Sequence, residues 1–170
     1  MKEIAYKYGA VSAGIMIVPM VIPMLIWGTE FDLELAEWLG YISMILAMLG
    51  VYFGTRSYRD HALDGNISFG KAFASGVLIS LVAALIFGIF TVFLYKFVLT
   101  DFADKYMDYS IEKIREGGAA ADEIARQIAE VNENRKLWRN PFFNGLVMFA
   151  TVFPIGAIIA LISAAVLKKS

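Results

Sequence analysis

Long apolar stretches without a charged side chain alternate with short charged stretches along this chain. Four of the apolar stretches, at 8–27, 39–53, 72–95 and 141–167, contain no Asp, Glu, Lys, Arg or His. An uncharged apolar run of about 18 residues or more is long enough to cross a bilayer as a helix. The sequence therefore predicts an all-α integral membrane protein, a single four-span membrane domain over 1–170. With flanking aromatic and basic residues included, the predicted spans are about 8–27, 38–55, 72–97 and 141–167.

The second apolar stretch is the shortest, and a buried or re-entrant helix is the alternative to a full crossing. Aromatic residues lie at both of its ends, which favours a crossing because Trp and Tyr gather at the membrane–water interface. Lys side chains at span ends can keep their ammonium groups among the lipid headgroups. The predicted interface anchors are Trp27, Trp38, Lys71, Lys96 and Trp138.

Residues 101–139 are polar on average but carry apolar residues at helical spacing. Met107, Ile111 and Ile114 share one face of a helix, and a second apolar face follows the Gly117-Gly118 turn, formed by Ile124, Ile128 and Val131. We predict an extracytoplasmic helical hairpin of two amphipathic helices between the third and fourth spans. Two helices of this length cannot form a core alone, so 101–139 is the expected contact surface for a second copy or another membrane protein.

Two charge patterns lie within this hairpin. Arg126 and Glu130 are spaced for an ion pair on one helix face. Four acidic residues line up on the first helix as a solvated face, for which a weak cation site is the alternative: Asp101, Asp104, Asp108 and Glu112.

Small residues recur every three or four positions within the spans. Close backbone packing through such residues drives helix association in lipid, so we interpret these stripes as helix-packing seams; a smooth substrate path is the alternative. The first span offers Ala10 and Gly14. The seam residues of the other spans are Gly40, Ser43, Ala47, Gly50, Gly54, Ala72, Gly76, Ser80, Ala84, Gly88, Gly156, Ala160 and Ala164.

Proline residues within the spans predict helix kinks, at Pro19 and Pro23 in the first span and at Pro154 in the fourth. Before the fourth span, Asn140 and Pro141 have the residue types of a helix N-cap and first helical position.

Lys and Arg are distributed in favour of cytoplasmic termini. They occur before the first span, between the second and third spans, and at the C-terminus, whereas the first loop contains Glu30, Asp32, Glu34 and Glu37 and no basic residue. Because cytoplasmic loops carry an excess of basic residues, we expect a multi-pass protein of a bacterial inner membrane with both termini in the cytoplasm. The basic residues are Lys2, Lys7, Arg56, Arg59, Lys71, Lys168 and Lys169.

Composition leaves little material for catalysis. Of the 170 residues, 59% are hydrophobic and 18% charged, with no cysteine and one histidine. Thiolate metal sites and cysteine nucleophiles are therefore excluded, and the absence of ionisable residues within the spans argues against an ion-coupled carrier. A net charge of −1 gives no indication of nucleic-acid binding. One weak polar cluster stands out, formed by Asp60, His61 and Asp64.

The segment GNISFGKA at 65–72 resembles a phosphate loop, but Ala72 replaces the Ser or Thr that would bind Mg²⁺ and no apolar strand precedes it. We interpret it as the start of the third span, with a turn at Asp64-Gly65 and Ser68 as N-cap. No nucleotide, metal or other cofactor is predicted.

Four segments carry a resemblance to a known family: YKYGAVSAGI, YRDHALDGNISFGKAFASG, YSIEKIREGGAAADEIARQI and NPFFNGLVMFATVFPIGAIIALISAAVLKK. With them, nearly the whole chain resembles the bacterial membrane family known as domain of unknown function 4199, found mainly in Bacteroidota. The resemblance implies four spans with a charged loop before the last. It implies no reaction, ligand or cofactor.

Three functions remain open from the sequence. The first is a non-enzymatic membrane protein that acts through contacts with protein or lipid, as a scaffold, modulator or assembly partner. The second is a passive carrier of lipid or small solute, formed by oligomerisation. The third is a membrane enzyme, for which only His61 and its acidic neighbours could be tested.

Overall fold

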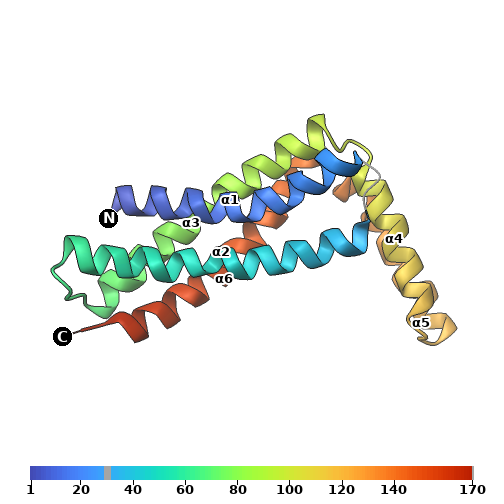
Figure 1. Cartoon of the computed structure of the whole chain (residues 1–170). Coiled ribbons are helices and arrows are strands. Elements are labelled where there is room, and N and C mark those ends of the chain that lie inside the picture. Colours follow the sequence, from blue (N-terminus) through green and yellow to red (C-terminus); the bar gives the residue numbers. More distant parts are fainter. Residues whose placement is uncertain (29–31, 170) are drawn as a thin grey trace.

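A computed structural model of the chain describes residues 1–28 and 32–169, and this part of the chain folds into α-helices joined by short turns (Figure 1). Four of these helices, α1, α2, α3 and α6, are long and apolar enough to cross a membrane, which confirms the predicted fold class. Glu30, which belongs to the acidic first loop, lies outside the described residues. The bounds are α1 Lys2–Trp27, α2 Leu33–Ala62, α3 Phe69–Phe97, α4 Phe102–Glu116, α5 Ala121–Trp138 and α6 Pro141–Leu167.

The four long helices form an up-and-down bundle in which each runs opposite to the long helix before it (Figure 1). The N-terminus, the turn between α2 and α3 and the end of α6 gather at one end, which we call the termini end. The hairpin of α4 and α5 extends from the opposite end, the hairpin end. At the termini end, the backbone N–H of Lys169 donates to the carbonyl oxygen of Ile67 at 3.0 Å and holds the tail to the turn.

The second span is a longer helix than the apolar run suggests. Asp32 caps α2 by accepting hydrogen bonds from the backbone N–H groups of Glu34 at 2.8 Å and Leu35 at 3.1 Å. Because this cap lies before the apolar run, α2 begins in the acidic loop and continues for 30 residues. The second span is therefore one continuous helix and not a short re-entrant segment.

Two further helix starts follow the predicted chemistry. Ser68 accepts from Lys71 N at 3.5 Å at the start of α3, and Asn140 accepts from Phe142 N at 3.0 Å at the start of α6. Asp64 has φ 48° and Gly65 has φ 81°, a left-handed pair that turns the chain between α2 and α3. The predicted caps and turn are therefore confirmed, and GNISFGKA follows a helix rather than a strand.

Helices α1 and α6 continue through their internal prolines, Pro19 and Pro23 in α1 and Pro154 in α6. Proline has no backbone N–H, so each removes one hydrogen bond from its helix. The kinks expected there stay a prediction.

Helices α3 and α6 pack closely along small residues. A Cβ built on Gly76 would lie 2.6 Å from Ala160 Cβ, and one built on Gly156 would lie 2.5 Å from Ser80 Oγ. A Cβ on Gly88 would lie 2.9 Å from the carbonyl oxygen of Gly145. Real side chains do not approach so closely, so only glycine permits these backbones to cross where they do.

Helix α2 contributes a second close crossing, against α1 and α3. A Cβ on Gly54 would lie 2.6 Å from Ile79 Cδ1, and one on Gly50 would overlap Ser12 Oγ, which donates to the carbonyl oxygen of Ala47 at 2.8 Å. The remaining predicted seam residues are also buried, namely Ser43, Ala47, Ala72, Ser80, Ala84, Ala160 and Ala164.

Three positions depart from the predicted stripes. A Cβ built on Gly40 or Gly14 would meet nothing within 4 Å, so neither glycine is required for packing. On α1 the buried small residues include Gly9 and Ala13, and a Cβ built on Gly9 would lie 2.7 Å from Val82 Cβ, whereas Ala10 is exposed. The stripe on α1 was thus predicted one residue out of register, because four-residue spacing alone does not fix which face of a helix meets its neighbour.

The two hairpin helices are held together by ion pairs. Arg135 contacts Asp108 at 2.6 Å and Asp104 at 3.2 Å, and Arg139 contacts Asp104 at 3.0 Å. The guanidinium groups of Arg139 and Arg135 lower the pKa of Asp104. The acidic face is therefore neither simply solvated nor open to a cation, since two of its four carboxylates pair with α5; a third, Asp101, contacts Lys105 at 3.2 Å.

Arg126 pairs with a different residue from the one predicted. Its guanidinium contacts Glu123, through Nη2–Oε1 at 2.7 Å and Nε–Oε2 at 3.0 Å, rather than Glu130. Glu123 lies in the first turn of α5, where helical N–H groups favour an acidic side chain. Hydrogen bonds from Arg126 and Gln127 lower the pKa of Glu123 to about 2.

Candidate functional site

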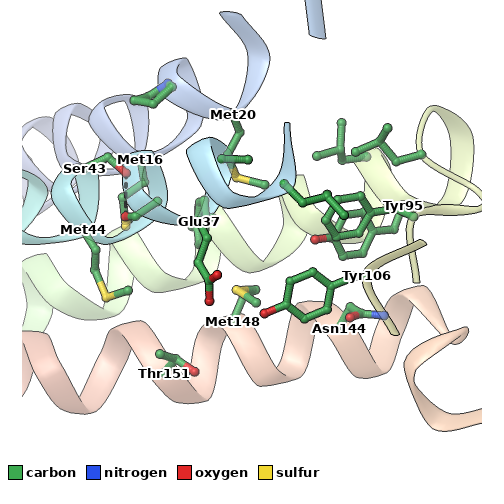
Figure 2. Close-up of a pocket in the computed structure, with 18 of the residues that line it drawn as sticks. Met16, Met20, Glu37, Ser43, Met44, Tyr95, Tyr106, Asn144, Met148 and Thr151 are labelled. Carbon is green, nitrogen blue, oxygen red and sulfur yellow. Dashed lines mark hydrogen bonds between the residues drawn. The ribbon is translucent and has the colours of Figure 1, made fainter. Parts of the chain in front are cut away.

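The hairpin end of the bundle contains a pocket of about 340 Å³ between α1, α2, α3 and α6, covered by the start of the hairpin (Figure 2). This volume lies within the range of small-molecule sites, about 300–1,000 Å³. We call it the methionine pocket. Its lining residues are Met16, Pro19, Met20, Pro23, Met24, Leu33, Ala36, Glu37, Gly40, Tyr41, Ser43, Met44, Phe87, Leu94, Tyr95, Leu99, Phe102, Ala103, Tyr106, Met107, Trp138, Asn144, Met148, Thr151 and Val152.

Methionine is frequent in the pocket wall. Of the eight methionines in the chain, six line it: Met16, Met20, Met24, Met44, Met107 and Met148. The thioether side chain is flexible and polarisable, and it adapts to ligands of different shape. A concentration of this residue type on one cavity therefore favours binding of variable apolar groups over a fixed catalytic geometry.

The pocket is closed toward the termini end by the tightly packed half of the bundle. Ser43 and Met16 form its floor, and beyond them lie the close crossings at Gly50, Gly76 and Gly156. Since Cβ atoms built at these glycines would overlap neighbouring helices, the described residues leave a blind cavity here rather than a path along the bundle.

Three polar side chains in the wall are bonded to backbone carbonyl groups. Ser43 donates to the carbonyl oxygen of Gly40 at 2.9 Å, and Thr151 donates to that of Val147 at 2.8 Å. The Asn144 amide donates to the carbonyl oxygens of Trp138 and Asn140 at the junction of α5 and α6. These groups hold the wall in place and leave little polarity for a ligand.

The carboxylate of Glu37, by contrast, is directed into the cavity. Figure 2 shows this carboxylate and the Tyr106 hydroxyl pointing into the same space beside Met148. The hydroxyl of Tyr41, one turn further along α2, donates to Glu37 Oε1 at 3.4 Å. Burial raises the pKa of Tyr106, and the negative charge of Glu37 adds to that effect. The wall therefore presents one carboxylate among tyrosine and methionine side chains.

The hairpin supplies the roof of the pocket. Phe102 and Tyr106 of α4 stack with Tyr95 of α3 in a row, with centroid distances of 5.1 Å and 5.9 Å between successive rings. Further along α4, Lys113 Nζ contacts Glu34 Oε2 at 2.9 Å. Glu34 raises the pKa of Lys113. The roof is thus attached by ring stacking near the cavity and by an ion pair outside it.

The predicted interface anchors divide between the two ends of the bundle. Trp27 and Trp38 are exposed beside the hairpin end, and Lys71 is exposed in the first turn of α3 at the termini end. Lys96 lies 5.4 Å from the ring centroid of Phe97. Trp138 differs, because it also lines the pocket. Their role at a membrane surface stays a prediction.

The weak polar cluster is not assembled into a site. Asp60 contacts Arg59 at 2.6 Å and Arg56 at 3.5 Å, while His61 Nδ1 donates to the carbonyl oxygen of Ser57 at 3.1 Å. Within 1–28 and 32–169, no group of three His, Cys, Asp or Glu side chains could hold a metal ion. Asp60 and His61 instead bond within α2, and Asp64 lies in the turn that follows this helix.

Sequence reasoning missed the pocket and its carboxylate. Glu37 was counted with the acidic first loop, whereas it lies in the second turn of α2. One signal was available: Asp32 precedes two further acidic residues, an arrangement typical of a helix start. An N-cap predicted at Asp32 would have placed Glu37 within the helix, one turn from Tyr41.

These features define a class, a multi-pass helical membrane protein with a pocket between its long helices and the α4–α5 hairpin. The chain matches the family described as "Protein of unknown function (DUF4199)" over residues 7–169, and it belongs to that family. No curated protein and no solved structure matches it.

Proposed function

We propose that this protein acts without catalysis, by binding a small apolar or amphiphilic molecule in the methionine pocket. The observation that carries the proposal is the pocket of about 340 Å³, whose wall includes six methionine and six aromatic side chains. A well-formed apolar pocket with a few polar groups is the feature by which small-molecule sites are usually recognised. Access from the bilayer suits such a ligand, because lipid already concentrates apolar molecules.

The packing of the bundle supports binding in preference to passage. A passive carrier needs a path along the helices, and the small-residue faces that could line one are occupied by close helix contacts at Gly50, Gly76 and Gly156. A ligand seated above these crossings stays at the hairpin end. The protein would then modulate a partner, or store or present a lipid-like molecule.

Gly40 offers a direct test, because it lines the pocket and a Cβ there meets nothing within 4 Å. A leucine at this position extends into the cavity without displacing backbone. We expect Gly40→Leu to weaken binding of a neutral solvatochromic dye such as Nile red by about tenfold, about 1.4 kcal/mol. The measurement is a fluorescence titration of the protein in lipid nanodiscs.

Gly14→Leu is the matched control. Gly14 also lies within a span, a Cβ there also meets nothing within 4 Å, and it does not line the pocket. Its variant should bind the dye as the parent protein does. Equal dye affinity in the parent protein and both variants would place the dye outside the pocket and refute the proposal.

We infer that the chain lies in a bacterial inner membrane with both termini in the cytoplasm. The support is charge: the basic N-terminal segment, the α2–α3 turn and the C-terminal lysines all belong to the termini end of the bundle (Figure 1). The hairpin end would then face away from the cytoplasm, as the positive-inside bias requires.

Residues 101–139 provide a second contact surface, for a second copy or another membrane protein. The specific observation is that α5 has no buried residue, and its apolar positions Ile124, Ile128 and Val131 are only half-buried after α4 packs against it. Crosslinking in native membranes followed by mass spectrometry would identify the neighbour, and crosslinks confined to the spans would argue against this surface.

A further inference from the structure

The wall of the methionine pocket has an unbalanced charge. Among the lining residues within 1–28 and 32–169, Glu37 is the one acidic side chain and none is Lys, Arg or His. A carboxylate beside low-polarity side chains favours a positively charged neighbour more strongly than it would in water. An anionic ligand in the same cavity would meet repulsion without compensation.

Three basic side chains of the hairpin segment are paired with other carboxylates. Lys113 contacts Glu34 at 2.9 Å, while Arg135 and Arg139 contact Asp104. None of the ion pairs found in the described part of the chain includes Glu37. Its one hydrogen bond there comes from Tyr41 at 3.4 Å, near the long limit for such a bond. The carboxylate therefore keeps most of its capacity for a ligand.

Aromatic rings surround the same space. Tyr41, Tyr95, Phe102, Tyr106 and Trp138 all line the pocket. The faces of such rings attract cations, and sites for quaternary ammonium groups combine several of them. Methionine sulfur adds a polarisable surface for the apolar groups that such a cation carries.

A metal cation does not fit this wall. Ca²⁺ takes six to eight oxygen ligands, and Mg²⁺ requires near-octahedral oxygen coordination. Here one carboxylate faces thioether and aromatic side chains, and over residues 1–28 and 32–169 no cluster of potential ligands is present. The charge of a suitable ligand must instead be spread over, or shielded by, apolar groups.

We propose that the methionine pocket selects lipophilic organic cations, with the cationic centre beside Glu37 and the apolar groups against the methionine and aromatic wall. This inference rests on the proposed function, that the pocket binds a membrane-soluble small molecule. It adds the charge of the ligand and the residue that recognises it.

A pair of ions with the same shape and opposite charge tests the selectivity. Tetraphenylphosphonium and tetraphenylborate each carry four phenyl groups around a central atom. In nanodiscs of zwitterionic lipid loaded with the neutral dye, we expect the phosphonium to displace the dye at a concentration at least tenfold lower than the borate. In Glu37→Gln this difference should fall to about twofold or less, with the dye affinity retained.

Glu112→Gln is the control, because Glu112 is an exposed carboxylate of α4 and lies outside the pocket wall. It should keep the preference for the cation. Loss of the preference in both variants would assign it to the general surface charge and overturn the inference.

Failure of the inference is distinguishable from failure of the proposed function. Dye binding that depends on Gly40, with equal displacement by the two ions, would refute the cation preference alone. Dye binding that Gly40→Leu leaves unchanged would refute the pocket itself, and the inference with it.

Discussion

At the scale of single residues, glycine has two opposite roles in this bundle. Gly76 is fully enclosed, with a built Cβ 2.6 Å from Ala160 Cβ, whereas a Cβ at Gly14 or Gly40 would meet nothing within 4 Å. The residue type is the same in each case, and only the neighbouring helix differs. A substitution at Gly76 must therefore move a helix, while one at Gly40 only fills space.

We expect Gly76→Leu to destabilise the bundle, because the added side chain meets Ala160 backbone as well as its Cβ. Overpacking of this kind costs about 1–3 kcal/mol, and more where backbone must shift. Thermal unfolding in detergent, followed by circular dichroism, should show a lower Tm than the parent protein. Gly14→Leu introduces the same side chain into a span and should leave the Tm near the parent value; an equal drop in both variants would contradict this account.

The surroundings also decide the role of a charged residue, as Glu37 shows. The carboxylate is half-buried against apolar side chains. The other acidic residues of the same segment differ, since Asp32 and Glu34 are exposed and Glu30 lies outside the described residues. The chemistry of Glu37 depends on the helix face it occupies. Two positions along α2, Glu34 and Glu37, thus differ by one turn and have different surroundings.

At the scale of elements, the hairpin is two amphipathic helices fixed by paired charges and by contacts with α2 and α3. Asp104 receives both Arg135 and Arg139, and Lys113 reaches across to Glu34 on α2. Exposed ion pairs contribute only about 0–1 kcal/mol each. The hairpin should therefore open more readily than the spans, which bury small residues against one another.

Acidification should loosen the hairpin. The pKa of Asp104 is lowered by Arg139 and Arg135, so its stabilising contribution is present above the unfolded value of about 4 and is lost as the pH falls through the lower folded value. Hydrogen exchange of the amides in 102–138 can be followed by mass spectrometry between about pH 5 and pH 3. Over this range, protection of these amides should fall further in the parent protein than in Asp104→Asn.

Glu112→Gln serves as control for this titration, since Glu112 is exposed on the same helix. It should follow the parent protein through the acid range. If Asp104→Asn lost protection with pH as fully as the parent protein does, the contribution of this carboxylate would be refuted.

At the scale of the whole molecule, the bundle divides into two halves with different packing. Toward the termini end, small residues bring the backbones together at Gly50, Gly76 and Gly156; toward the hairpin end, methionine and aromatic residues surround a cavity. The rigid half fixes the helix positions, and the other half provides space for a ligand. The cavity is thus a property of all four long helices and the hairpin together.

The arrangement of the helices predicts which segments share a side of the membrane. The chain contains no cysteine, so single introduced cysteines can be labelled without background. We expect Ser68→Cys and Lys169→Cys to react with a membrane-impermeant maleimide only in inverted vesicles. Gly118→Cys should instead react in intact cells whose outer envelope has been permeabilised. Labelling of Ser68→Cys and Gly118→Cys from the same side would contradict the up-and-down order.

Much of the architecture was determined by the sequence alone. Uncharged apolar runs that cross a bilayer must be helices, because lipid offers no partner for backbone polar groups. Ser68 and Asn140 marked helix starts through local hydrogen bonds, and Gly117-Gly118 marked the hairpin turn. These features depend on residues close together in the chain, so periodicity and residue type suffice to find them.

The tertiary structure alone decided which faces meet and what lies between them. Four-residue spacing suggested Ala10 and Gly14 on α1, yet the packing uses Gly9, because helix rotation depends on all neighbouring helices at once. The methionine pocket brings together residues from Met16 to Val152, which no local pattern connects. Glu37 became part of that pocket through a cap that extends α2 and through a hairpin that closes over it.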